Sequence, residues 1–113
     1  MKQYQPSTSP CPIGRASRVL GDRWVLLILR EAFLGVDRFE DFMTRLPISR
    51  AALSSRLTMM VEAGLMERDP PDAKRARYAL TQSGQALAPV YAAITEWSGE
   101  HLFAEGEQPR KWD

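Results

Sequence analysis

The 113-residue chain has few of the residues that support catalysis, metal binding or covalent cross-linking. It contains one cysteine, Cys11, and one histidine, His101, which excludes an internal disulfide and a zinc site built from several cysteines. It also has no glycine-rich phosphate loop and no cysteine–histidine constellation. We therefore expect a protein that is not an enzyme and that holds no cofactor or metal.

Long apolar runs are also missing. None approaches the ~20 residues that a membrane span needs, so no membrane contact is expected. The first ten residues, MKQYQPSTSP, are polar and lack the apolar core of a signal peptide, which favours a cytoplasmic location. With 44% hydrophobic and 26% charged residues, the composition is typical of one soluble globular domain with a modest core.

Net charge is nearly absent, at +1, but the charges are unevenly distributed. Residues 1–80 carry 13 basic and 9 acidic side chains, whereas residues 81–113 carry 2 basic and 5 acidic ones. A basic body followed by an acidic tail is compatible with one nucleic-acid-binding face, although an asymmetry of this size also arises by chance.

Two helices are predicted in the first third of the chain. Pro12 suits the first position of a helix that stops at Gly21, and Asp22 suits the cap of a second helix that ends at Gly35. The run WVLLIL, residues 24–29, is apolar nearly all round, so the second helix is expected at the buried centre of the domain.

A helix-turn-helix pattern follows. Residues 38–46 have apolar side chains at i, i+3, i+4 and i+7, with Asp37 as the expected cap. After a tight turn, a second helix is predicted from Ser49 to Ala63, and Gly64 supplies its stop. Two short helices joined by a brief turn are typical of DNA-binding proteins.

The outer face of this second helix is unusually small, which would let it approach the floor of a major groove about 12 Å wide. We predict that it contacts DNA, and that the contacts include Ser49, Arg50, Ala51, Ser54, Ser55, Arg56 and Thr58. Two alternatives stay open: a small face can pack on another helix, and Arg56 lies near enough to the buried side to form an internal ion pair.

The hydrophobic period then changes to two, which predicts strands near residues 65–68 and 77–80 around a proline-containing loop. This hairpin carries Lys74, Arg75 and Arg77, which we expect along the DNA backbone or minor groove. A solvated run of charges is the plainer alternative. Thr81 is expected to cap one long final helix, which Pro89 would kink.

The final helix carries an apolar stripe that a chain of this size cannot readily cover. We predict that the stripe pairs with a second copy of the chain, with the first helix also taking part; the stripe includes Leu87, Tyr91, Ile94 and Trp97. The alternative is that it packs only on its own domain.

These elements together predict a mainly α fold with a small β-hairpin: a winged helix-turn-helix domain with an extra C-terminal dimerisation helix. We expect residues 1–10 to form a mobile arm, residues 11–105 the domain, and residues 106–113 a frayed tail. The predicted partners are double-stranded DNA and a second copy of the chain. The alternative is a winged-helix module that contacts only proteins.

Four motifs resemble those of the HxlR-type transcriptional regulators. They are Cys11-Pro12, Gly21-Asp22-Arg23-Trp24, Leu53-Ser54-Ser55-Arg56-Leu57 and Tyr78-Ala79-Leu80-Thr81-Gln82-Ser83-Gly84. The resemblance implies a bacterial, dimeric regulator that binds operator DNA as repressor or activator. The chain departs from it in having small residues at Ala51 and Ala52, so base recognition is expected to depend on the neighbouring polar side chains.

Cys11 is the candidate for redox sensing. It directly precedes the first helix, whose N-terminus favours an anionic thiolate, and Arg15 and Arg18 lie one and two turns further on. The resemblance adds weight, since some members sense oxidants or electrophiles through a cysteine at this position. The alternative is a small buried residue that packs the first helix against its neighbour.

Overall fold

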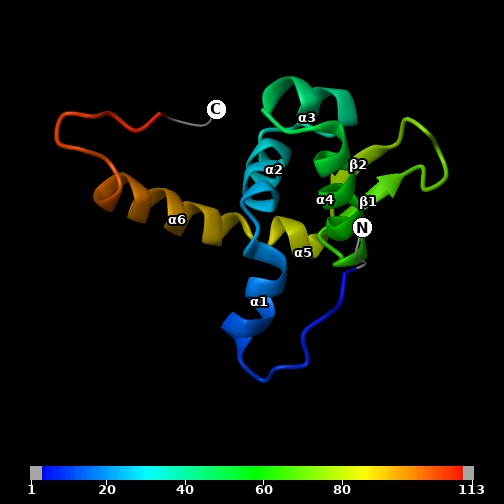
Figure 1. Cartoon of the computed structure of the whole chain (residues 1–113), viewed down its shortest axis with the longest axis horizontal. Helices are drawn as coiled ribbons and strands as arrows, with labels where there is room; N and C mark the ends of the chain where they lie inside the picture. Colours follow the sequence, from blue (N-terminus) through cyan, green and yellow to red (C-terminus); the bar gives the residue numbers. More distant parts are fainter. Residues whose placement is uncertain (1–3, 111–113) are drawn as a thin grey trace.

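A computed structural model describes residues 4–110 of the chain (Figure 1). In chain order the elements are α1 (Pro12–Leu20), α2 (Arg23–Phe33), α3 (Phe39–Arg45), α4 (Arg50–Glu62), β1 (Met66–Asp69), β2 (Arg77–Leu80), α5 (Gln82–Gln85) and α6 (Ala88–His101). This arrangement is a helix-turn-helix followed by a two-stranded wing, and it confirms the predicted fold class.

The core lies around α2, as its apolar run predicted. Val25, Ile28 and Leu29 are completely buried, and they pack with Phe42 of α3 and with apolar side chains of α4. From α4 the stripe predicted by the sequence supplies Leu53, Leu57 and Met60, all fully buried. The helix-turn-helix is therefore held on α2 by close apolar packing.

Local sequence signals set most of the helix ends. The Asp22 carboxylate accepts hydrogen bonds from the backbone N–H groups of Trp24 and Val25, and the Ser49 hydroxyl accepts one from Ala52 at 3.1 Å. Gly64 follows α4 with a φ of +82°, a conformation that favours glycine. The predicted start and end of α4, the helix expected to contact DNA and hereafter called the recognition helix, are thus confirmed.

Asp37 is not the cap of α3, contrary to the prediction. The N-cap residue is Arg38, and its side chain makes no capping hydrogen bond. The backbone carbonyl of Asp37 instead accepts a 2.8 Å hydrogen bond from the N–H of Tyr78, on the second strand of the wing. The backbone just before α3 is therefore held by a hydrogen bond to the wing and not by a local helix cap.

The wing is an antiparallel hairpin whose register pairs Met66 with Leu80 and Asp69 with Arg77. Its base is fixed by Thr81, which donates a hydroxyl hydrogen bond to the Gly64 carbonyl and a backbone hydrogen bond to the Leu65 carbonyl. The end of the wing is thereby joined to the end of α4.

The predicted single final helix is two helices. Thr81 does cap a helix, but that helix is the short α5, and the chain turns at Ala86 and Leu87 before α6 begins. Pro89 lies in the first turn of α6, where its missing N–H breaks no intrahelical hydrogen bond. The proline therefore marks a new helix start, not a kink.

Only the first turns of α6 lie against the body of the domain, and the rest leads away from it (Figure 1). The Tyr91 hydroxyl donates a 2.6 Å hydrogen bond to the Leu26 carbonyl, which attaches α6 to α2. The radius of gyration is 15.0 Å, larger than the roughly 13 Å of a compact chain of about this size. None of the helices within residues 4–110 is long and apolar enough to cross a membrane.

Candidate nucleic-acid interface

The outer face of α4 is as small as the sequence indicated. Ala51, Ser54 and Thr58 are exposed, while Ser55 is half-buried. The Thr58 hydroxyl donates a 2.9 Å hydrogen bond to the Ser54 carbonyl within the helix, which still leaves its oxygen able to accept. These short side chains would allow close approach to a groove.

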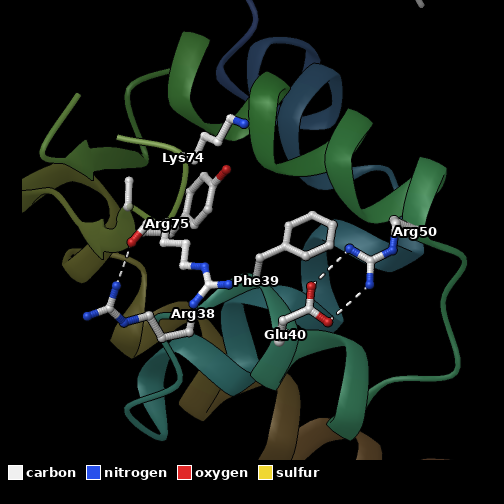
Figure 2. Close-up of a pocket in the computed structure, with 8 residues that line it drawn as sticks. Arg38, Phe39, Glu40, Arg50, Lys74 and Arg75 are labelled. Atoms are coloured by element: carbon white, nitrogen blue, oxygen red, sulfur yellow. Dashed lines mark hydrogen bonds and ion pairs between the residues drawn. The ribbon is translucent and has the colours of Figure 1, made fainter. Parts of the chain in front are cut away.

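A cationic groove lies beside this face, between the start of α3, the start of α4 and the loop of the wing. It has a volume of about 860 Å³, and Figure 2 shows the side chains around it. Its lining residues are Arg38, Phe39, Glu40, Arg50, Lys74, Arg75, Ala76 and Tyr78. Four cations and one carboxylate therefore line a space with two aromatic rings.

Arg50 is held at one side of the groove by two groups from α3. Its Nη1 and Nη2 atoms donate to the two carboxylate oxygens of Glu40 at 2.9 and 3.0 Å, and its guanidinium lies 5.2 Å from the centre of the Phe39 ring. The pair is exposed, because the Arg50 and Glu40 side chains keep 64% and 70% of their accessible surface. The Arg50 guanidinium is therefore oriented by α3 and remains accessible to solvent.

Two arginines that sequence reasoning did not single out shape the wing. Arg38 donates a 2.6 Å hydrogen bond to the Arg75 carbonyl, and this bond joins the start of α3 to the wing loop. Arg68 donates a 2.6 Å hydrogen bond to the Ala73 carbonyl and lies over the Tyr78 ring. Neither role has a signature in residue spacing, because both acceptors are backbone atoms placed by the fold.

Two of the predicted DNA-contacting cations lie outside this groove. Arg56 forms an ion pair with Asp22, with its Nη2 atom 3.0 Å from Oδ2. The alternative of an ion pair within the domain is therefore the correct one for Arg56, which is not on the outer face of α4. Arg77 is exposed on β2, 3.8 Å from the Asp37 carboxylate. The structure thus brings together Arg50, Lys74 and Arg75 but not the other two.

A buried carboxylate positions α3. Glu31 of α2 is 2% exposed, and it accepts hydrogen bonds from Arg30 at 2.8 Å and from Arg45 at the end of α3. Burial would raise the pKa of Glu31, but the hydrogen bonds from Arg45 and Arg30 outweigh it and hold the pKa below its ordinary value. Sequence periodicity did not identify this contact, since Arg30 and Glu31 follow the apolar run of residues 24–29 as an ordinary pair of charged residues.

The predicted dimerisation residues divide into two groups. Tyr91 is buried in its own domain, where its ring meets Phe33 edge-on at 5.2 Å, so it is not available to a partner, and Leu87 packs partly against the same core. Ile94 and Trp97 keep 41% and 55% of their surface exposed. The prediction that Tyr91 contacts a partner is therefore wrong. The exposed apolar side chains of the predicted set lie further along α6, beyond the point where Tyr91 joins it to α2.

Cys11 is the N-cap residue of α1 and is exposed in the single chain. Its sulfur accepts a hydrogen bond from the Gly14 N–H at 3.4 Å, as expected for an anion-favouring helix end. Arg15 and Arg18 donate to the carbonyls of Ser9 and Gln5, not to the sulfur. The alternative, in which Cys11 is a small buried residue that packs the first helix against its neighbour, does not hold in the single chain, because Cys11 is exposed.

A helix-turn-helix on a buried central helix, with a basic wing beside it, defines the winged-helix class of transcriptional regulators. Residues 19–105 match the model of the HxlR-like helix-turn-helix family. The chain belongs to this family, as its motifs predicted.

Two relatives illustrate the match. An HTH-type transcriptional regulator of Mycobacterium bovis, Mb3122, is 47% identical over 92 residues, which cover 80% of this chain and 58% of that protein. The chain thus spans little more than half the length of this relative. The regulator YodB of Bacillus subtilis is 31% identical, over 80% of this chain and 84% of that protein.

Solved structures agree with this assignment. The transcription factor PA1607 superposes with a TM-score of 0.85 at 36% identity, covering 92% of this chain and 74% of that one. The reduced form of YodB superposes with a TM-score of 0.67 at 26% identity, covering 88% of this chain and all of that one.

Proposed function

We propose that this protein regulates transcription by binding double-stranded DNA, with α4 in the major groove and the wing loop on the adjacent backbone. The observation that carries the proposal is the groove in which Arg50, Lys74 and Arg75 gather beside the small outer face of α4. The cations would contact phosphates and set the register, and Ser54, Ser55 and Thr58 would reach base edges. Arg77 would contact phosphate from the strand of the wing.

We further propose that the protein acts as a homodimer. The exposed large apolar side chains lie mostly on or just after α6, with one on α1: Val90, Ile94, Trp97, Leu102, Phe103 and Ile13. Large apolar side chains left exposed along one helix of a small protein are typical of an interaction surface. Two-fold pairing would place two recognition helices about 34 Å apart, or a multiple of that distance, and would require an inverted-repeat site.

The proposal is tested by measuring binding to two kinds of DNA duplex over a range of salt concentrations. One has a random sequence, and the other, the selected operator, is obtained by selecting bound duplexes from a random library. Lys74→Ala should weaken binding to all sequences alike and reduce the salt slope by about one, because it removes one phosphate contact. Thr58→Ala should change the sequence preference and leave the slope unchanged. Binding that does not vary with salt, or no binding at all, would instead favour a module that contacts only proteins.

Regulation through Cys11 is a further part of the proposal. Its support is the exposed sulfur at the N-terminus of α1, a helix that also carries the exposed Ile13. The related regulator YodB has also been solved in a reduced form. An oxidant could take two electrons and two protons from two thiols, leaving a disulfide between Cys11 and a small thiol or the partner's Cys11. Such a bond would change the dimer and hence the distance between recognition helices.

We expect mild oxidation by diamide to change operator affinity in the wild type and not in Cys11→Ser. The comparison is made on selected duplex before and after diamide, with thiol labelling of the folded protein alongside. Reversal by dithiothreitol controls for irreversible damage. An equal response of the two proteins, or a thiol that does not label in the folded state, would contradict sensing.

A further inference from the structure

Glu40 is the one carboxylate among the side chains that line the cationic groove. It lies in the first turn of α3, and both of its oxygens accept hydrogen bonds from Arg50 of α4. In Figure 2 the Arg75 side chain of the wing extends toward the same carboxylate. The hydrogen bond from Arg50 and, to a smaller extent, the charges of Arg50 and Arg75 lower the pKa of Glu40, so it is ionised at neutral pH.

The geometry of this cluster is that of an occupied anion site. A planar carboxylate that accepts two parallel N–H bonds from one guanidinium is matched by two oxygens of a phosphate, which arginine binds in the same bidentate manner. The site opens to solvent and lies between the recognition helix and the wing, where a DNA backbone would pass. Arg50 is also kept in position by the Phe39 ring, so its direction does not depend on Glu40 alone.

We propose that Glu40 holds the place of a DNA phosphate in the free protein and is displaced when DNA binds, so that it sets affinity and limits binding to non-specific DNA. The inference rests on the proposed DNA-binding function. Arg50 would exchange a carboxylate for a phosphate, and Arg75 would approach the same phosphate from the wing. Each binding event would then leave an unpaired carboxylate near the DNA, and only sites with enough base contacts would offset that loss.

Salt dependence gives the exchange a distinct signature. A phosphate contact normally releases condensed cations from DNA, with a slope of about 0.9 per phosphate. In the exchange, a cation gathers at the freed Glu40 carboxylate and offsets one of those released. Removing the carboxylate should therefore steepen the salt dependence.

The test measures binding of Glu40→Gln and wild type to a random-sequence duplex across a salt series. We expect the variant to bind at least about threefold more tightly at moderate salt, because binding no longer has to break the Glu40–Arg50 pair, and its slope to be steeper by about one. The Glu40 side chain is 70% exposed, so the variant should fold, and circular dichroism checks this.

Two further variants make the result specific. Glu62→Gln removes the same charge from an exposed site at the far end of α4 and should change binding little. In an Arg50→Ala background, Glu40→Gln should lose most of its effect, because the arginine to be released is absent.

Several results would overturn the inference. They are unchanged affinity and slope in Glu40→Gln, an equal gain in Glu62→Gln, or an undiminished gain without Arg50. The proposed function is judged separately: a wild type that binds no duplex overturns both proposals, whereas salt-dependent wild-type binding with an unaltered Glu40→Gln overturns only this one.

Discussion

Gly84→Ala should destabilise the protein by about 3 kcal/mol, the upper end of the usual cost of overpacking a rigid site. A Cβ atom at this position would lie 2.2 Å from the Leu65 carbonyl oxygen and 3.0 Å from Leu80 Cδ2. The oxygen belongs to the backbone between α4 and the wing, and it already accepts the hydrogen bond from Thr81. Relieving the clash would require α5 to separate from the base of the wing.

Gly99→Ala is the matched control. The nearest atom to a Cβ there is Pro109 Cγ at 3.7 Å, an ordinary contact, and the residue lies inside α6. This substitution should leave stability unchanged or raise it by roughly 0.5–1 kcal/mol, because alanine favours the helix. Urea unfolding at one fixed protein concentration compares the two variants, and equal stabilities would contradict the close packing of α5 on Leu65.

Trp97→Glu should convert the proposed homodimer to a monomer and reduce operator affinity by about 100-fold or more, because two linked half-site contacts become one. Trp97 lies with Ile94 on the exposed stretch of α6, and a carboxylate there would have to be desolvated in an apolar interface. Sedimentation at micromolar concentration measures the assembly, and a mobility shift measures affinity.

Ala92→Glu provides the comparison for the dimer. It places the same charge on the same helix, four residues before Glu96 and hence on that polar face. It should leave both assembly and affinity close to those of the wild type. A wild type that sediments as a monomer, or a Trp97→Glu variant that remains dimeric, would show that α6 is not the interface.

Much of the site could be predicted because its elements have local causes. The caps at Asp22 and Ser49, the apolar stripe of α4 and the left-handed Gly64 depend on neighbours within a few residues, so periodicity and capping rules located the recognition helix. The basic character of the wing was equally visible in the sequence, since it is a matter of composition.

Patterns within a few residues predicted the elements from α1 to the wing, the small outer face of α4 and the family. Which charges meet depends instead on how the helices pack: Arg50 pairs with Glu40, Arg56 with Asp22, and Glu31 with Arg45. The packing of the chain also set the position of the last helices. It also buried Tyr91 and divided the final helix in two. These ion pairs and the Tyr91 hydrogen bond join residues 10 to 65 positions apart, and their partners are set by the way the helices cross. Caps and apolar stripes, by contrast, depend on residues only a turn or two away.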